Sequence, residues 1–275
     1  MSKFLREAKI GLGLNKNLIP AGMYEYIKDF SILKAEENVE FFLDNGSSEI
    51  GIVVLYGNCE LYIAGKKYEL GSRNSVFGTE PPHGFFGAEL PCGFYIPKDT
   101  NFGINSLTKL ELVICKGWCE KKTEPKLILP QDIKVMHPGK DNLKREVRII
   151  IGADSPSVNM IIGETLSPAG NWSGTPAHKH DVLNPPHESL HEELYLFKMK
   201  TDTDFGIQRS YSPGHKINEL MLLKNNSLTF MPWGYHQIVA GPGYPLYYLF
   251  FLSGKGKELI PLVDPEHKWL LNLGG

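Results

Sequence analysis

Two histidines separated by a single residue, His178 and His180, are the clearest candidates for chemistry in this sequence. On a β-strand, residues i and i+2 face the same side, so both imidazoles could point into one cavity while Lys179 points away. A third histidine, His236, follows a proline–glycine turn in the segment MPWGYH. With one carboxylate, these three would form a mixed nitrogen and oxygen set that suits Zn, Mn, Fe or Ni and leaves positions open for substrate. We therefore expect one divalent metal ion.

The carboxylate ligand is expected from the stretch that follows His180, where Glu188, Glu192 and Glu193 compete. Glu193 opens the strand-like run ELYLFKM, whereas Glu188 follows two prolines and is expected in a loop. We favour Glu193 as the ligand and keep Glu188 as the alternative.

The same stretch contains a competing motif, because residues 187–191 read HESLH and fit the HExxH pattern of zinc proteases. That chemistry needs a helix, which would place His187 and His191 on one face with Glu188 as general base. The neighbouring segments are strand-like and two prolines precede the motif. The pattern therefore favours a loop over a helix for His187 and His191 and leaves both interpretations open.

The segments that must position these residues are short and rich in β-branched and aromatic side chains. They are separated by turn signals such as YGN, GKK, PGH and GPGY. This pattern indicates an all-β barrel or sandwich. Few stretches have a helical period, and the expected helices are short, at residues 4–11 and 264–271.

A stretch rich in Lys, Glu and Pro interrupts the strand pattern between residues 116 and 144. We place a boundary there, with one domain at residues 1–130 and another at residues 131–275. The segments around Pro97 and Pro232 both indicate a strand, a proline turn and a second strand, and their alignment puts Asn101 opposite His236. The halves therefore look like two copies of one unit, of which only the second has metal ligands.

Composition limits the classes of function. The 275 residues are 42% hydrophobic and 22% charged, and the formal net charge is −2. These values are typical of a globular protein, and without a basic face we expect no nucleic-acid partner. The N-terminal stretch has no apolar signal region, and no run reaches the ~18 apolar residues of a membrane span. We expect a cytoplasmic protein without a membrane partner.

Four segments resemble the 5-deoxy-glucuronate isomerase family of inositol catabolism, a bicupin family related to the uronate ketol-isomerase of pectin breakdown. They are GETLSPAGNWSGTPAHKHD from residue 163, EELYLFKM from 192, FGIQRSYS from 205 and MPWGYHQIVAGPGYPLYYLFFLSG from 231. Ala177 and Trp233 depart from the family, which commonly has proline and arginine there. The resemblance implies two jelly-roll (cupin) barrels in tandem, by analogy in a homo-oligomer.

The implied activity is a metal-dependent aldose–ketose isomerisation of 5-deoxy-D-glucuronate to 5-dehydro-2-deoxy-D-gluconate. The implied metal ligands are His178, His180, Glu193 and His236, and the ion would act as a Lewis acid on the open-chain sugar acid. The candidate catalytic residues are Glu164, as a base, and Arg209, which could also bind the substrate carboxylate. Candidate contacts to substrate hydroxyls are Gln208, Tyr211 and Tyr247.

Other functions fit parts of the same evidence. A related uronate ketol-isomerase or a metal-dependent cupin dioxygenase could use the same ligands. A non-enzymatic sugar-binding bicupin has less need for an open-sided metal site, and a zinc protease would depend on His187 and His191.

Overall fold

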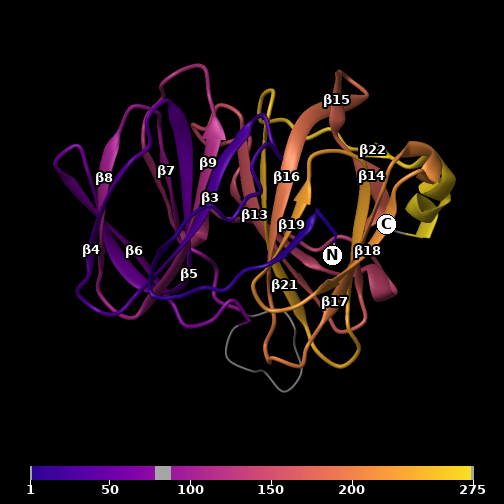
Figure 1. The fold of residues 1–275 in the computed structure, drawn as a ribbon, viewed down its shortest axis with the longest axis horizontal. Coiled ribbons are helices and arrows are strands. Elements are labelled where there is room, and N and C mark those ends of the chain that lie inside the picture. The colour runs from indigo at the N-terminus through magenta and orange to yellow at the C-terminus, as the bar shows by residue number, and fades with distance from the viewer. Residues whose placement is uncertain (1, 78–87, 274–275) are drawn as a thin grey trace. The chain divides into compact units, whose positions relative to one another are not determined.

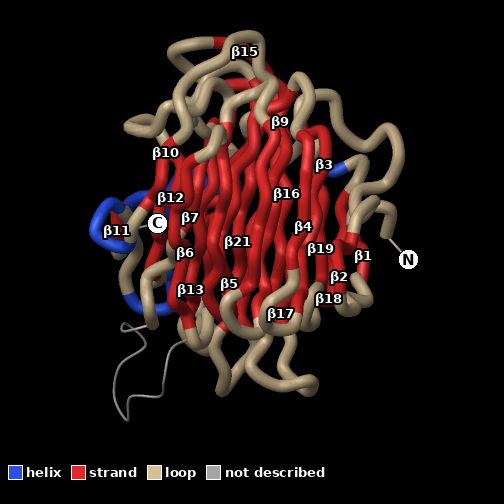
Figure 2. The backbone as a smooth tube through the Cα atoms, turned by 90° about the vertical axis from the view of Figure 1, so that its left-hand side faces the viewer, coloured by secondary structure: helices blue, strands red, loops and turns tan. Residues whose placement is uncertain are grey.

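The computed structural model describes residues 2–77 and 88–273, and most of this backbone is β-strand (Figure 2). The chain divides into two compact units. Within the described residues, unit 1 contains the N-terminal residues through Ala8, the segment Val135–Arg148 and the chain from Gly163 onward. Unit 2 contains Lys9–Lys134 and Ile149–Ile162. Each unit thus takes in a segment from the other side of the boundary that we place at residue 130.

Unit 2 is built around β5 (Ser48–Ile63), which pairs antiparallel with four other strands. The strands of its sheet are β2 (Gly13–Asn15), β3 (Ile27–Ala35), β4 (Glu40–Asp44), β6 (Lys66–Arg73), β7 (Gly93–Ile96), β8 (Asn101–Ser106), β9 (Leu110–Trp118) and β10 (Lys126–Ile128).

Apolar side chains fill the core of unit 2. Ile52, Leu61, Phe94, Ile104 and Leu112 belong to one buried cluster, and none is more than 1% exposed. Each such side chain stabilises the fold by roughly 1.5–3 kcal/mol relative to exposure.

Unit 1 contains a second large sheet in the order β1-β19-β16-β21-β13-β12-β11, with β15 paired to β16. Figure 1 shows β16, β19 and β21 side by side, as the register of the pairs requires. Its strands are β1 (Leu5–Glu7), β11 (Lys134–Met136), β12 (Glu146–Ile151), β13 (Met160–Ser167), β15 (Asp181–Asn184), β16 (Glu188–Lys198), β19 (Ser227–Met231) and β21 (Leu246–Gly254). The boundaries between the units fall within or beside β11, β12 and β13.

A smaller sheet completes unit 1, in the order β18-β17-β20-β14-β22. Its strands are β14 (Trp172–Lys179), β17 (Gly206–Tyr211), β18 (Asn218–Leu223), β20 (Tyr235–Ala240) and β22 (Leu262–Val263). Pro232 lies in the turn between β19 and β20, and Pro97 lies in the turn between β7 and β8. The succession of strand, proline turn and strand therefore occurs in both units.

Helices in the described residues are short 3₁₀ turns: η1 (Pro130–Asp132), η2 (Asp141–Leu143), η3 (Pro213–His215) and η4 (Pro265–Leu273). The last of these covers the helix expected at 264–271. The helix expected at 4–11 is wrong, because β1 forms there and pairs with β19, with Arg6 opposite Leu228. So short a helix is marginal by itself, and the neighbouring strand supplies better hydrogen bonds. No described helix is long and apolar enough to span a bilayer.

Candidate metal centre

Two strands of the smaller sheet bring His178 and His236 together. They are direct partners in the antiparallel pair of β14 and β20, and their ring centroids are 4.9 Å apart. The register shifts between Ser173 and His178, so an irregular stretch precedes the first histidine. The ring of His180, just beyond the end of β14, lies 6.0 Å from that of His178 and 5.4 Å from that of His236. A ligand nitrogen of each histidine lies within 4.8 Å of those of the other two.

The carboxylate of Glu193, on β16, points toward these histidines. Its Oε2 atom is 3.1 Å from Nε2 of His180 and 3.1 Å from Nε2 of His236. Ligand atoms about 2.1 Å from one ion and at right angles to each other would lie about 3.0 Å apart. Nε2 of His236 is buried and has no hydrogen-bond partner among the described residues, even though the Glu193 oxygen is close. A cation bound between His236 Nε2 and Glu193 Oε2 would give this unpartnered nitrogen a partner.

The protonation states of His178 and Glu193 also suit a cation. Burial lowers the pKa of His178 to about 3, assisted by the nearby His236 and His180, so this imidazole is neutral at physiological pH. Burial alone would raise the pKa of the Glu193 carboxyl, but the hydrogen bond to His180 and the proximity of His236 bring that pKa well below its usual range. Metals bind neutral imidazoles and ionised carboxylates, so these two groups need no large rearrangement of protons.

The second ring nitrogens orient two of the histidines. Nδ1 of His180 lies 2.9 Å from the carbonyl oxygen of His191, and Nδ1 of His236 lies 3.2 Å from that of Gly234. An imidazole that donates Nδ1–H to a carbonyl leaves Nε2 as the ligand atom. Both Nε2 atoms thereby face Glu193.

The alternative ligand, Glu188, has other partners. It begins β16, and its carboxylate accepts hydrogen bonds from Lys179 Nζ at 2.7 and 2.9 Å and from the backbone N–H of Asp181 at 2.8 Å. Lys179 also contacts Asp181 Oδ1 at 2.6 Å, and Asp181 Oδ2 accepts a hydrogen bond from the Gly234 N–H at 2.7 Å. Lys179 is thus buried between charged partners rather than exposed. This bracing cluster (Lys179, Asp181 and Glu188) connects the strand of His178 and His180 to the turn before His236.

We expect the Lys179→Met substitution to weaken metal binding by roughly 10–100-fold, the usual cost of removing a partner that orients the ligands. The substitution leaves the buried Glu188 and the partly buried Asp181 without their cation, so the ligand-bearing segments should lose their fixed spacing. Competition with a chromophoric chelator measures the affinity. Lys216→Met, at an exposed position near β17, is the matched control. Equal affinities for the two variants would show that the bracing cluster does not position the ligands.

The zinc-protease interpretation is wrong. His187 is exposed in a turn, and residues 188–191 form the start of strand β16 instead of a helix. His191 is a buried strand residue, not a loop residue as expected, and its Nε2 lies 3.0 Å from the carbonyl oxygen of Gly256. A strand cannot place residues i and i+4 as a helix does, so His187 and His191 do not form the protease pair.

Residues of β17 divide between two faces. Ser210 pairs with His236 and therefore faces the metal side, as does Gln208 two residues earlier. Gln208 is fully buried, its Oε1 accepts a hydrogen bond from Thr229, and its Nε2 has no hydrogen-bond partner among the described residues. Arg209 and Tyr211 face the opposite side, where the guanidinium lies 4.2 Å from the tyrosine ring centroid. The structure does not bring Arg209 or Tyr211 next to His178, His180 or His236.

Glu164 and Tyr247 also lie away from the metal side. Tyr248 pairs with Phe197, which shares a strand face with Glu193, so its neighbour Tyr247 points the other way. The Tyr247 hydroxyl donates a 2.9 Å hydrogen bond to Glu164, placing that carboxylate on the far face as well. The structure therefore does not bring Glu164 or Tyr247 to the candidate metal ligands.

Two further aromatic residues, Tyr195 and Tyr248, lie on the metal side. The ring of Tyr195 is 5.9 Å from that of His236 and 5.5 Å from that of Tyr248, whose hydroxyl is hydrogen-bonded to Ser173. The alternation of β16 contained the signal for Tyr195, since residues 193 and 195 share a face. For Tyr248, nothing in the sequence decides which of two adjacent tyrosines points inward.

Comparisons with known proteins find relatives over most of the chain. A model of the KduI/IolB family matches residues 16–270. The 5-deoxy-glucuronate isomerase of Geobacillus thermodenitrificans is 33% identical over 224 residues, which are 81% of this chain and 78% of that protein. The 5-deoxy-glucuronate isomerase of Bacillus subtilis (strain 168) is 31% identical over 245 residues, 88% of this chain and 87% of that protein.

Solved structures share the fold. A crystal structure of an IolB-like protein from Salmonella typhimurium LT2 has a TM-score of 0.89 and 25% identity, and the match covers 98% of this chain and all of the other. A mutant of Bacillus subtilis oxalate decarboxylase has a TM-score of 0.60 at 10% identity and covers 95% of this chain and 77% of its own. The second likeness concerns the fold alone. The expected all-β bicupin fold is confirmed.

Proposed function

The chain belongs to the KduI/IolB family and is an isomerase, and from this premise we propose that it converts 5-deoxy-D-glucuronate into 5-dehydro-2-deoxy-D-gluconate in myo-inositol catabolism. The observation on which the site assignment depends is the Glu193 oxygen that lies 3.1 Å from both His180 and His236. We assign the metal ligands to His178, His180, Glu193 and His236. A divalent ion held there would act as a Lewis acid on neighbouring carbonyl and hydroxyl oxygens of the open-chain sugar acid.

The protein's own residues would bind and orient the substrate on the metal side. The unpartnered Gln208 amide nitrogen is a donor that a substrate hydroxyl could satisfy, and burial without a partner is costly. Tyr195 and Tyr248 form an aromatic wall beside His236, which would exclude water from the reacting carbons. His178 is the partly exposed member of the ligand set and marks the side from which substrate enters.

The remaining expectations belong to the same proposal. The ion is one of Zn, Mn, Fe or Ni, since a set of three imidazoles and one carboxylate accepts all of these. The curated relatives are named as metabolic isomerases, which supports a small sugar acid as substrate. We also propose that the protein is cytoplasmic and forms a homo-oligomer.

A metal-dependent dioxygenase remains the second candidate, because an open-sided site with these ligands would also suit oxygen chemistry. Incubation of the purified protein with 5-deoxy-D-glucuronate under anaerobic conditions separates the two. We expect full conversion to the keto acid, observed by NMR, without oxygen uptake.

Metal removal is the control for this experiment. Treatment with a strong chelator should abolish turnover, and one of the four candidate ions should restore it. Metal-replete protein that fails to convert the substrate would rule out the proposed isomerisation. Conversion that requires oxygen would instead favour the dioxygenase.

A further inference from the structure

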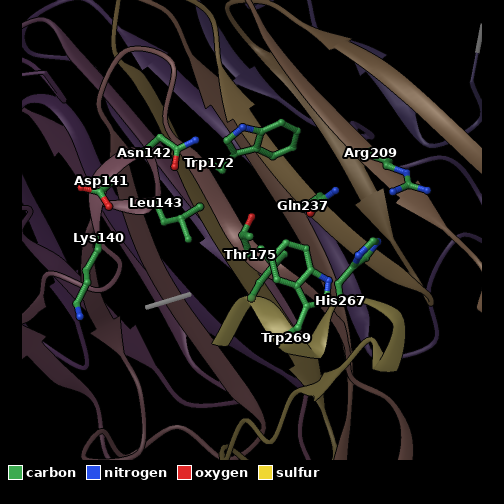
Figure 3. Close-up of a pocket in the computed structure, with 11 residues that line it drawn as sticks. Lys140, Asp141, Asn142, Leu143, Trp172, Thr175, Arg209, Gln237, His267 and Trp269 are labelled. Carbon is green, nitrogen blue, oxygen red and sulfur yellow. The ribbon is translucent and has the colours of Figure 1, made fainter. Parts of the chain in front are cut away.

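A cavity in unit 1 lies outside the metal centre, since none of the four candidate ligands lines it. It has a volume of about 470 Å³, within the usual range of small-molecule sites (~300–1,000 Å³). Its floor is the smaller sheet, with Trp172 and Thr175 from β14, Arg209 from β17 and Gln237 from β20 (Figure 3).

Two short 3₁₀ segments form the walls of this outer pocket. Lys140 and the residues of η2 stand on one side, and His267, Trp269 and Leu270 of η4 on the other. Asp264 anchors the start of η4, because its N–H donates to the carbonyl of Ala177 at 2.9 Å and its carboxylate accepts a 2.5 Å hydrogen bond from the Tyr211 hydroxyl. These hydrogen bonds thus connect η4, which carries Trp269, to the sheet that carries Arg209.

The outer pocket and the metal centre use opposite faces of the same strands. His236 faces the metal, and its neighbour Gln237 lines the pocket. Arg209 pairs with Gln237 and likewise faces the pocket, while Gln208 faces the metal side. A ligand in the pocket would therefore be separated from the metal by the thickness of the sheet.

The lining combines flat aromatic surfaces with positive charge. In Figure 3, Thr175 and Gln237 lie between the two indole side chains of Trp172 and Trp269. Trp269 is 59% exposed, which is unusual for so large an apolar side chain unless it contacts a ligand or a partner. Indole faces are suited to the C–H face of a sugar ring, and the polar side chains between them offer hydrogen bonds to its hydroxyls.

Arg209 lies at one side of the lining, and two contacts hold its side chain. Its Nε donates to Asn218 at 3.1 Å and its guanidinium plane lies against Tyr211, so the side chain is held in one position. These contacts leave its terminal nitrogens for a bidentate acceptor such as a carboxylate or a phosphate. Lys140 adds a second positive charge to the lining, and Asp141 is the one carboxylate among the lining residues.

We propose that the outer pocket binds an anionic sugar, either a sugar acid or a sugar phosphate, with its ring against the indoles and its anionic group at Arg209. The pocket is a second ligand site, distinct from the one at which isomerisation is proposed. Arg209 would thus bind an anion, as its sequence context indicated, but in the outer pocket and not at the metal centre.

Isothermal titration of the holoprotein with D-glucuronate, D-glucose 6-phosphate and neutral D-glucose tests the proposal. We expect saturable binding of at least one of the two charged sugars, with glucose at least about tenfold weaker, since a charged hydrogen bond is lost. The more strongly bound anionic sugar identifies the carboxylate or the phosphate as the preferred group.

Variants on the two faces of β17 locate the binding. Arg209→Leu and Trp269→Ala should each weaken it by roughly tenfold or more, the usual effect of removing a charged or aromatic anchor. Lys268→Leu, on η4 but outside the pocket lining, should change it by less than about twofold, and Gln208→Leu tests whether the sugar binds on the metal-side face instead. The test is independent of turnover, so its failure would leave the isomerase assignment untouched.

Three outcomes would overturn the proposal. These are no saturable binding of either charged sugar, equal binding of glucose, or binding that depends on Gln208 and not on Arg209. If Trp269→Ala instead changes the number of chains per assembly and no sugar binds, the pocket is a contact between copies of the chain and the proposal is wrong.

Discussion

Replacing His236 with alanine is expected to remove the bound metal and to lower turnover by roughly three orders of magnitude. The ion's Lewis acidity accounts for several kcal/mol of transition-state stabilisation, and every ~1.4 kcal/mol is a factor of ten in rate. His236 provides a buried Nε2 that has no hydrogen-bond partner among the described residues and is therefore free to coordinate the expected ion. Its loss would also leave the Glu193 carboxylate with one imidazole fewer to compensate its charge.

The measurement is elemental analysis of the purified variant together with its rate of conversion. His178→Ala should behave in the same way, because its ring is the direct strand partner of His236. His187→Ala is the matched control, since that histidine lies in an exposed turn of the same stretch, and it should retain full metal content. Full occupancy in both His178→Ala and His236→Ala would mean that the metal lies elsewhere.

The largest loss of stability is expected from Arg148→Met, about 3–5 kcal/mol in the free energy of unfolding. Arg148 is 1% exposed and donates from Nη1 to Glu164 at 2.7 Å and from Nε to Glu146 at 2.6 Å. Methionine fills a similar volume but leaves two buried carboxylates without their cation. Urea-induced unfolding followed by tryptophan fluorescence measures the change.

A triple variant with Arg148→Met, Glu146→Leu and Glu164→Leu is the control for that experiment. It removes the unpaired charges together and should recover much of the stability, because an apolar replacement of a whole buried ion cluster is often neutral. A free energy of unfolding for Arg148→Met within about 0.5 kcal/mol of the native protein would contradict the prediction.

The same cluster explains why Glu164 was a reasonable candidate for the base. A lone acidic residue within the apolar strand MIIGETLS suggests a functional carboxylate facing inward. The strand does turn Glu164 into a buried position, but on the face where Arg148 and Tyr247 lie. Its charge is needed for an ion pair that stabilises the fold, and no alternation rule could tell which side of β13 would face the metal.

The choice between the two glutamates shows the same limit. The sequence favoured Glu193 because it opens a strand-like run, yet the strand begins five residues earlier, at Glu188. Glu188 was expected in a loop and instead accepts hydrogen bonds from Lys179 and from backbone N–H groups of β15. The preference for Glu193 agrees with the observed geometry, but the reason for it was only partly right.

The sequence by itself determined the all-β class, the strand-and-proline-turn pattern shared by both halves, and the three histidines that gather in the second. These features depend on local periodicity, turn residues and ligand spacing, and each of these can be recognised within a short segment of the sequence. The face assignments of His178 and His180 follow from the two-residue repeat of a strand.

Only the tertiary structure decided which of the other polar residues share that face. Gln208 and Arg209 are adjacent in sequence, yet one faces the metal side and the other the outer pocket. A shift of one residue in register exchanges the two faces of a strand, and register is fixed by pairing with strands far away in the sequence. For this reason the cluster of candidate metal ligands could be predicted from the chain, whereas the residues around it could not.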